Sequence, residues 1–297
     1  MLFTISEALR KAVSFLHSCE IDLPRLDAEV LLAFILQKDR IYLYLYENEE
    51  LPPEIWIIYE ALIKRRGAGE PLAYLTKEKE FMGFSFSMAE GVLIPRPETE
   101  HLVEAVITWI KLKYPGSEEA ASPSSEIHIL DLGTGCGNIS LSLLLNLPAV
   151  QVTGIDREEK AVALTRHNAV ALGAEKRLNL QCGRYWDDLE DPGERKYNVI
   201  VSNPPYIPTS ELPFLQAEVL REPLSALDGG EDGLQAYREI FSKTHLYLAS
   251  PGLLALEIGL GQADAVLSLA ENCTDFFHQT EIQQDYAGID RVLLLEH

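Results

Sequence analysis

One stretch of this 297-residue chain predicts its fold: Ile127-His128-Ile129-Leu130-Asp131-Leu132-Gly133-Thr134-Gly135-Cys136-Gly137. Its first half is a short apolar run, typical of a buried strand, and its second half is a glycine-rich turn. An apolar helical segment, residues 139–145, follows at once. Glycines let a backbone approach a ligand closely, and a helix N-terminus offers free N–H donors. Strand, turn and helix in this order therefore predict a nucleotide-binding crevice in an α/β sheet.

The residues around this turn indicate which ligand the crevice binds. The glycine spacing is G-x-G-x-G, which differs from the G-x-G-x-x-G of pyrophosphate binders, and no P-loop lysine follows. Asp131 would repel a phosphate but attract a cation. A second strand, residues 150–155, ends in Asp156, where a carboxylate can accept hydrogen bonds from both ribose hydroxyls.

A ligand with a ribose, a positive charge and no phosphate is S-adenosylmethionine. We expect the cofactor to be bound by residues of the turn, by the acidic residues on either side of it and by a later asparagine, namely Asp131, Gly133, Thr134, Gly135, Cys136, Gly137, Asp156 and Asn203. No metal site is expected, because the four cysteines are scattered, with no C-x-x-C pair and no histidine at ligand spacing.

Strand-like and helix-like segments alternate from this stretch to the C-terminus. We predict helices over residues 158–172, 233–248 and 262–270, and strands over residues 178–182, 197–201, 253–258, 276–283 and 290–295. A short turn through Ala287-Gly288 joins the last two strands, so the last strand should be antiparallel to its neighbour. The pattern predicts a seven-stranded, doubly wound α/β sheet with a reversed terminal hairpin.

A second motif, Asn203-Pro204-Pro205-Tyr206, directly follows the predicted strand at residues 197–201. Two prolines cannot continue a strand, so Asn203 should lie at its carboxyl end, the edge where open α/β sheets bind ligands. The Asn203 amide and the Pro204 carbonyl, beside the Tyr206 ring, would form a slot for an –NH2 group on a flat π system. The alternative is a strand-ending turn with an incidental aromatic residue.

The N-terminal part of the chain has a different pattern. Apolar residues at helical spacing predict a small helical domain over residues 1–70. Alternating residues 84–88, followed by Ala89-Glu90-Gly91, indicate a β-hairpin linker over residues 71–95. The sheet domain should occupy residues 96–297 and include a flexible surface loop at residues 113–126, where the sequence has no periodicity. Arg96, framed by prolines, is either a solvated charge before a helix or a group held rigidly against the active site.

Composition excludes some classes of protein. The chain has 46 acidic and 25 basic residues, a net charge of −21, so a direct nucleic-acid partner is not expected. No apolar run approaches a membrane span, and the N-terminus lacks the pattern of a signal peptide. The scattered cysteines suit a reducing environment, and a cytoplasmic location is expected.

The motifs in their order resemble the amino-methyltransferases that act on planar nitrogens, and within them the peptide-chain release factor glutamine N5-methyltransferase family. The resemblance spans nearly the whole chain, through Arg25-Leu26-Asp27-Ala28-Glu29, residues 94–100, 131–137 and 202–207, Glu222-Pro223, residues 226–234, and Tyr286, Gly288, Asp290 and Arg291. It implies a class I methyltransferase fold with S-adenosylmethionine as cofactor. It also implies a helical domain that recognises a release factor, with the acceptor glutamine held by Arg96, Asn203, Pro204, Pro205 and Tyr206.

One segment departs from the family pattern. After the third strand the family usually has an acidic residue and an apolar or aromatic pair against the adenine, but this chain has Cys182-Gly183-Arg184-Tyr185-Trp186. We expect Tyr185 to contact the adenine, with Trp186 as the second choice.

Three functions are compatible with these observations. The first is methylation of a release-factor glutamine, in which Asn203, Pro204 and Tyr206 would be the catalytic groups. The second is methylation of an N6-adenine or other exocyclic amine in DNA or RNA, since both substrates present a flat –NH2 group. The third is a non-enzymatic module that binds the cofactor.

Overall fold

The computed structural model describes residues 3–116, 127–187, 189, 196–271 and 276–297. The chain forms two compact units, each described by itself. The first contains Met1–Glu78 together with Leu215–Arg221, and the second contains Lys79–Phe214 and Glu222–His297. Of the loop predicted over residues 113–126, residues 117–126 lie outside the described part. Among the described helices, none combines the length and the apolar character needed to cross a membrane.

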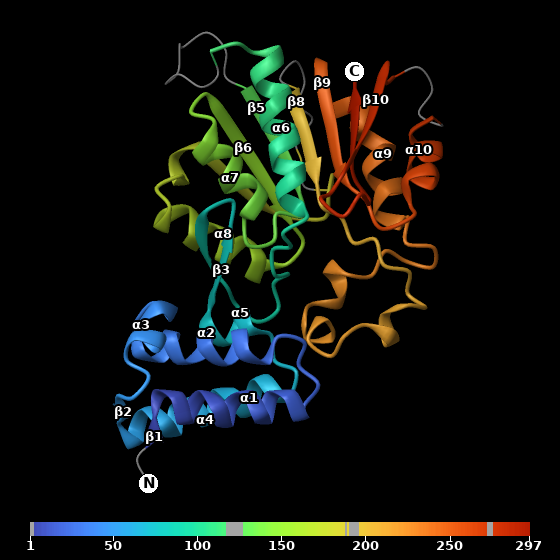
Figure 1. Ribbon diagram of the computed structural model, residues 1–297. Coiled ribbons are helices and arrows are strands. Elements are labelled where there is room, and N and C mark those ends of the chain that lie inside the picture. The colour runs from blue at the N-terminus through green and yellow to red at the C-terminus, as the bar shows by residue number, and fades with distance from the viewer. Residues whose placement is uncertain (1–2, 117–126, 188, 190–195, 272–275) are drawn as a thin grey trace. The chain divides into compact units, whose positions relative to one another are not determined.

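The first unit is helical, as the apolar spacing predicted (Figure 1). Its elements are β1 (Phe3–Thr4), α1 (Ile5–Ser18), α2 (Pro24–Leu36), α3 (Arg40–Leu45), β2 (Glu50–Leu51), α4 (Pro53–Gly67) and α5 (Leu72–Thr76). Thr4 caps α1 in a capping box with Glu7, which satisfies two of the N–H groups that a helix start leaves free. Leu16, Leu31 and Tyr59 belong to the buried core of this unit.

The second unit contains a seven-stranded sheet in the order β10-β11-β9-β8-β5-β6-β7. Strand β11 is antiparallel to β9 and β10, and the other described pairs are parallel. The predicted doubly wound sheet with a reversed last strand is therefore confirmed. The strands are β5 (Ile127–Leu132), β6 (Val150–Asp156), β7 (Leu178–Cys182), β8 (Tyr197–Ser202), β9 (Leu248–Glu257), β10 (Gln279–Gln284) and β11 (Asp290–Glu296).

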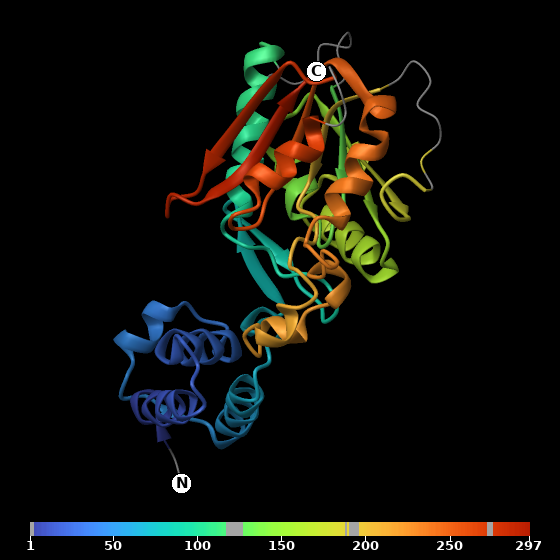
Figure 2. The same cartoon turned by 90° about the vertical axis from the view of Figure 1, so that its right-hand side faces the viewer.

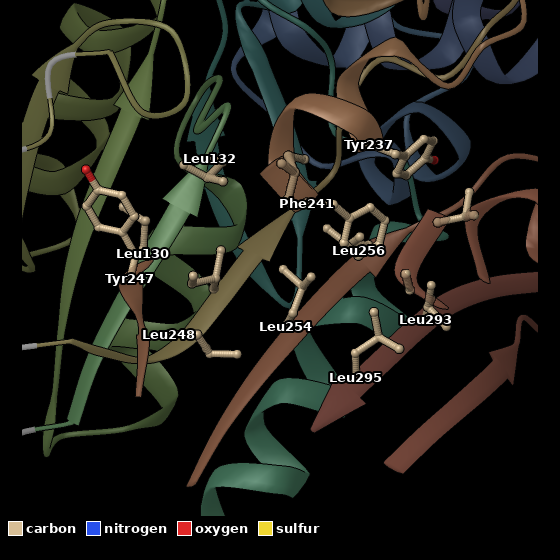
Figure 3. Packing of buried hydrophobic residues seen from close by; sticks show 14 of the residues in the cluster. Leu130, Leu132, Tyr237, Phe241, Tyr247, Leu248, Leu254, Leu256, Leu293 and Leu295 are labelled. Atoms are coloured by element: carbon tan, nitrogen blue, oxygen red, sulfur yellow. The ribbon is translucent and has the colours of Figure 1, made fainter. Parts of the chain in front are cut away.

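Helices cover both faces of this sheet, with α6 and α9 on opposite sides (Figures 1 and 2). The helices are α6 (Thr99–Lys113), α7 (Asn138–Asn146), α8 (Glu159–Ala171), α9 (Gln235–Tyr247) and α10 (Ala263–Glu271). Leu130, Leu254 and Leu293 point from their strands into one buried cluster with Tyr237 and Phe241 of α9 (Figure 3). Because successive side chains along a strand point to opposite faces of the sheet, the residues next to these leucines face α6.

A two-stranded hairpin, β3 (Glu78–Phe81) and β4 (Phe84–Ser87), precedes this sheet in the chain. The expected hairpin exists, but its turn is Met82-Gly83 and not Ala89-Glu90-Gly91. Both turn residues have positive φ, 51° for Met82 and 75° for Gly83. A glycine tolerates that conformation readily, which explains the position of the turn.

The sheet brings the ends of its parallel strands to one edge. Strands β5, β6, β8 and β9 pair in parallel and end at Leu132, Asp156, Ser202 and Glu257. The two motifs that the sequence singled out start directly after β5 and β8. The fold thus places them side by side, at the edge where a doubly wound sheet binds ligands.

Candidate active site

A cavity of about 350 Å³ lies at this edge of the sheet, in the size range of small-molecule sites. Its lining comes from segments far apart in the chain. They include the turn after β5 (Gly133, Gly135), the end of β6 (Asp156), the turn after β7 (Tyr185), the segment after β8 (Asn203, Pro205), the segment before α6 (Leu93, Pro95, Arg96), the first residue of α6 (Thr99) and residues 223–226.

The glycine turn is bonded to the end of β6. The Gly133 N–H donates to the Ile155 carbonyl at 2.8 Å, and the Gly135 N–H donates to Asp156 Oδ2 at 2.8 Å. The Glu158 N–H donates to Asp156 Oδ1 at 2.9 Å. Burial raises the pKa of Asp156, while the two backbone donors lower it. The carboxylate is therefore oriented by the backbone in the wall of the cavity.

Gly137 shows why this turn needs glycine. Its φ is +87°, and a Cβ atom there would lie 2.8 Å from Thr165 Cγ2. Any larger residue would be strained and would also push α8 away from the turn.

Asp131 lies beneath the turn and is fully buried. Its Oδ2 atom accepts hydrogen bonds from the Thr134 hydroxyl at 3.0 Å and from the Ser140 hydroxyl. Burial raises its pKa to about 6. Among the described residues, Asp131 is not part of the cavity lining, so its expected role toward the cofactor remains a prediction.

The turn after β7 separates its two aromatic residues. Tyr185, with φ of 48°, lines the cavity, and burial raises its pKa. Trp186 instead packs in the core, where its ring stacks on Tyr247 with 5.0 Å between centroids and its Nε1 donates to the Glu239 carbonyl. Arg184 also lines the cavity and pairs with the Glu239 carboxylate. The geometry favours Tyr185 as the aromatic wall of a cofactor site.

Asn203 is linked to two buried residues from other elements. Its Nδ2 donates to the Thr99 hydroxyl at 3.0 Å, and that hydroxyl donates to Glu257 Oε2 at 2.6 Å. Thr99 begins α6, and Glu257 ends β9, the neighbour of β8 in the sheet. With its amide turned this way, the acceptor that Asn203 can offer a ligand in the cavity is its Oδ1 atom.

Tyr206 is held through its backbone. The Gln262 Nε2 donates to the Tyr206 carbonyl at 2.9 Å, and a Cβ atom on Gly233 would lie 2.4 Å from that same carbonyl oxygen. Burial raises the pKa of the Tyr206 hydroxyl to about 12. Asn203 and Pro205 line the cavity, whereas Pro204 and Tyr206 are not among its described lining residues.

Arg96 lines the cavity and is anchored from behind. Its Nη2 pairs with Glu222 Oε1 at 2.5 Å, and Glu222 Oε2 accepts a hydrogen bond from the Ile94 N–H at 2.9 Å. Glu222 is 4% exposed, so one buried carboxylate fixes both the backbone and the side chain of this segment. Of the two interpretations that the sequence left open, this geometry favours a rigidly held group.

The structure thus brings seven of the predicted site residues into one cavity lining: Arg96, Gly133, Gly135, Asp156, Tyr185, Asn203 and Pro205. Thr134, Cys136 and Gly137 belong to the same turn without being in that described lining. Thr99, Glu222 and Glu257 have no role among the functional residues predicted from the sequence. A signal existed for Glu257, since a lone carboxylate ends the otherwise apolar run at residues 253–257, next to the strand of Asn203.

Known proteins resemble both units. The family model described as the PrmC N-terminal domain matches residues 7–76, and the methyltransferase small domain model matches residues 119–255. Two curated proteins named release factor glutamine methyltransferase are similar over 98% of this chain. The one from Moorella thermoacetica is 40% identical and matched over 98% of its length, and the one from Clostridium acetobutylicum is 38% identical and matched over 97%.

A solved structure shares the fold at lower identity. It is the hMettl16 catalytic domain in complex with MAT2A 3'UTR hairpin 6, with a TM-score of 0.55 and 12% identity, covering 84% of each chain. This likeness concerns the fold alone.

Proposed function

Since the chain belongs to the release factor glutamine methyltransferase family, we propose that it transfers a methyl group from S-adenosylmethionine to the side-chain amide nitrogen, N5, of a glutamine in a peptide-chain release factor. The acceptor is the glutamine of the Gly-Gly-Gln loop. The release factor as partner and the cytoplasm as location belong to this proposal. The net charge of −21 supports a protein substrate over a nucleic acid.

The cavity has the groups that such a cofactor needs. Asp156, oriented by two backbone N–H groups, can accept hydrogen bonds from ribose hydroxyls, and Tyr185 offers a flat wall for the adenine. Gly133 and Gly135 leave room for the ligand to approach the backbone, because side chains are absent there. When bound, S-adenosylmethionine supplies an electrophilic methyl group.

The observation that carries the proposal is the orientation of Asn203. An amide nitrogen is a poor nucleophile, since its lone pair is delocalised into the carbonyl, and positive charge develops on it as it becomes methylated. The Asn203 Oδ1 and the Pro204 carbonyl can accept hydrogen bonds from the two N–H groups of the glutamine. These bonds strengthen as the charge develops, so they stabilise the transition state more than the ground state.

The remaining steps need no strong base among the residues of the site. Tyr206 would fix the plane of the amide, which aligns the nitrogen with the methyl group. An N-alkylated amide cation is acidic and loses its proton to water. The roles of Arg96 and Pro205 toward the substrate are part of the proposal, supported by their position in the cavity lining.

A methyl-transfer assay tests the proposal. Purified release factor and cofactor labelled in the methyl group are incubated with the enzyme, and the modified residue is located by mass spectrometry. We expect one methyl group on the Gly-Gly-Gln glutamine and none on a factor in which that glutamine is alanine.

The matched enzyme variant is Asn203→Ala. It should lower the rate by roughly a hundredfold, because one preorganised partner of the developing charge is removed. Its affinity for the cofactor, measured by calorimetry, should fall only moderately. Transfer within about threefold of wild type would exclude Asn203 from the catalytic role.

A further inference from the structure

Two hydrogen bonds connect Asn203, Thr99 and Glu257. The protonation state of Glu257 can determine which group donates and which accepts in each of them. A threonine hydroxyl has one proton, and an ionised carboxylate is only an acceptor. With Glu257 ionised, Thr99 donates its proton to the carboxylate, as the 2.6 Å contact places it. The hydroxyl oxygen is then free to accept the bond from Asn203 Nδ2. The Asn203 oxygen consequently faces the acceptor nitrogen.

Protonation of Glu257 removes this constraint. The carboxylic acid can then donate to the Thr99 oxygen, and the Thr99 hydroxyl donates in turn to an acceptor. The acceptor available is the Asn203 oxygen, reached by turning the amide through half a rotation. The turned amide presents its –NH2 to the cavity, and an –NH2 group cannot accept a hydrogen bond from the N–H groups of the glutamine.

We infer that Thr99 and Glu257 are positioning residues that determine which end of the Asn203 amide meets the acceptor nitrogen, and that methyl transfer requires Glu257 in its ionised form. This inference rests on the proposed function for the identity of the acceptor. The hydrogen bonds between Asn203, Thr99 and Glu257 do not depend on which substrate the enzyme methylates. Both residues are 1% exposed, so water does not compete for their bonds.

The surroundings of Glu257 place its ionisation in the physiological range. Burial raises its pKa to about 7, and the hydrogen bond from Thr99 opposes that rise. Among the charged groups around it, Arg291 and Arg96 lower the pKa and Glu98 raises it. The titratable hydroxyls of Tyr206 and Tyr237 are also close enough to interact with its charge. A cationic cofactor in the cavity would lower the pKa further.

The sign of the pH effect follows. Glu257 is ionised above its pKa and protonated below it, so kcat should fall as the pH drops through about 7 or somewhat lower. The substitution Glu257→Gln introduces an amide that can donate to Thr99, as the acid can. We expect this variant to lower kcat at least tenfold at about pH 8 and to leave the KM for the release factor within about threefold of the wild-type value. The fall of kcat at low pH, the acidic limb of the pH profile, should be absent.

Two variants at Thr99 distinguish its effect on the orientation of the Asn203 amide from its contribution to packing. Thr99→Val has the same shape but no hydroxyl, and should lose rate and the acidic limb as Glu257→Gln does. Thr99→Ser retains the hydroxyl and should recover most of the lost rate. Glu104→Gln makes the same chemical change on an exposed residue of α6 and serves as the control, with the wild-type rate and pH profile.

A second measurement needs no substrate. The side-chain ¹⁵N–¹H signals of Asn203, assigned by their loss in Asn203→Ala, should shift in the full-length protein with a midpoint near pH 7. They should not shift in this range in Thr99→Val or Glu257→Gln. If wild-type enzyme leaves release factors unmodified but the Asn203 signals titrate, the proposed function fails and the positioning chain stands.

The opposite results would overturn the inference. They are a wild-type kcat with an unchanged acidic limb in Glu257→Gln, or Asn203 signals that do not respond to pH between about 5.5 and 9. Should Glu257→Gln fail to fold, Thr99→Val decides the question by the same two measurements.

Discussion

Asp156 illustrates how one carboxylate can organise a site and also serve as a ligand group. Each of its oxygens accepts one backbone hydrogen bond, from Gly135 and from Glu158, and each has a further lone pair for a ligand in the cavity. The same residue thus determines the shape of the glycine turn and offers acceptors for ribose hydroxyls.

Asp156→Ala should therefore weaken cofactor binding strongly. Hydrogen bonds to a charged group contribute about 1.5–3 kcal/mol, so we expect the dissociation constant to rise by about tenfold to a hundredfold, measured by calorimetry. Asp187→Ala, an exposed carboxylate that follows the next strand, is the control and should bind as wild type does. An unchanged affinity in Asp156→Ala would mean that the cofactor binds elsewhere.

Among single residues, the sequence predicted those site residues that belong to a recognisable motif. Asn203 and Asp156 could be found because each stands at the end of a recognisable strand. The carboxylate that ends an apolar run singles out Glu257 in the sequence, but neither Glu257 nor Thr99 could be given a role, since each acquires its partner only through the fold. Glu257 meets Thr99 because β9 pairs with β8 and α6 packs over that face, and neither fact is written in the residues next to Glu257.

At the scale of elements, the turn at residues 229–233 acts as a rigid support for the segment after β8. The Ile207 N–H donates to the Leu227 carbonyl, and the Gly229 N–H donates to the Ile207 carbonyl. Gly233 has φ of +74° and packs directly on the Tyr206 carbonyl. The position of Tyr206 therefore depends on a neighbouring turn in which three of the five residues are glycines.

Gly233→Ala should reduce both stability and activity, because the new methyl group would displace Tyr206 or Gln262. The matched control is Gly173→Ala, where φ is +69° but no atom lies within 4 Å of the added Cβ. The control should lose about 1 kcal/mol from backbone strain alone and keep its kcat. A Gly233→Ala variant with the stability and rate of the control would show that the contact does not position Tyr206.

Helices and strands could be predicted from the sequence where their apolar residues recur at a regular spacing. Most helices and strands with regular apolar spacing were predicted within a few residues, as for β10, expected at 276–283 and found at Gln279–Gln284. Strand β9, expected at 253–258, begins five residues earlier and is Leu248–Glu257. Residues 207–228 contain only short 3₁₀ turns and an isolated bridge, with no periodic pattern to detect. Within them Leu215–Arg221 belongs to the helical unit through contacts such as Arg66 with Glu218, which depend on residues far apart in sequence.

At the scale of the whole molecule, net charge distinguishes the two substrates that the Asn203 slot alone cannot. An adenine amino group and a glutamine amide both present a flat –NH2 group. A chain with 46 acidic and 25 basic residues repels a phosphate backbone during approach and attracts a basic protein. For a release factor with a basic docking surface, the rate of transfer should accordingly fall as salt is raised.

The most direct test of the central claim is a competition in one reaction, with the full-length enzyme, labelled cofactor, a release factor and adenine-containing duplex DNA at equal concentration. We expect the label on the release factor, at a single glutamine, and no label on the DNA above the level of an Asn203→Ala reaction. Label on the DNA, with the release factor unmodified, would contradict the claim.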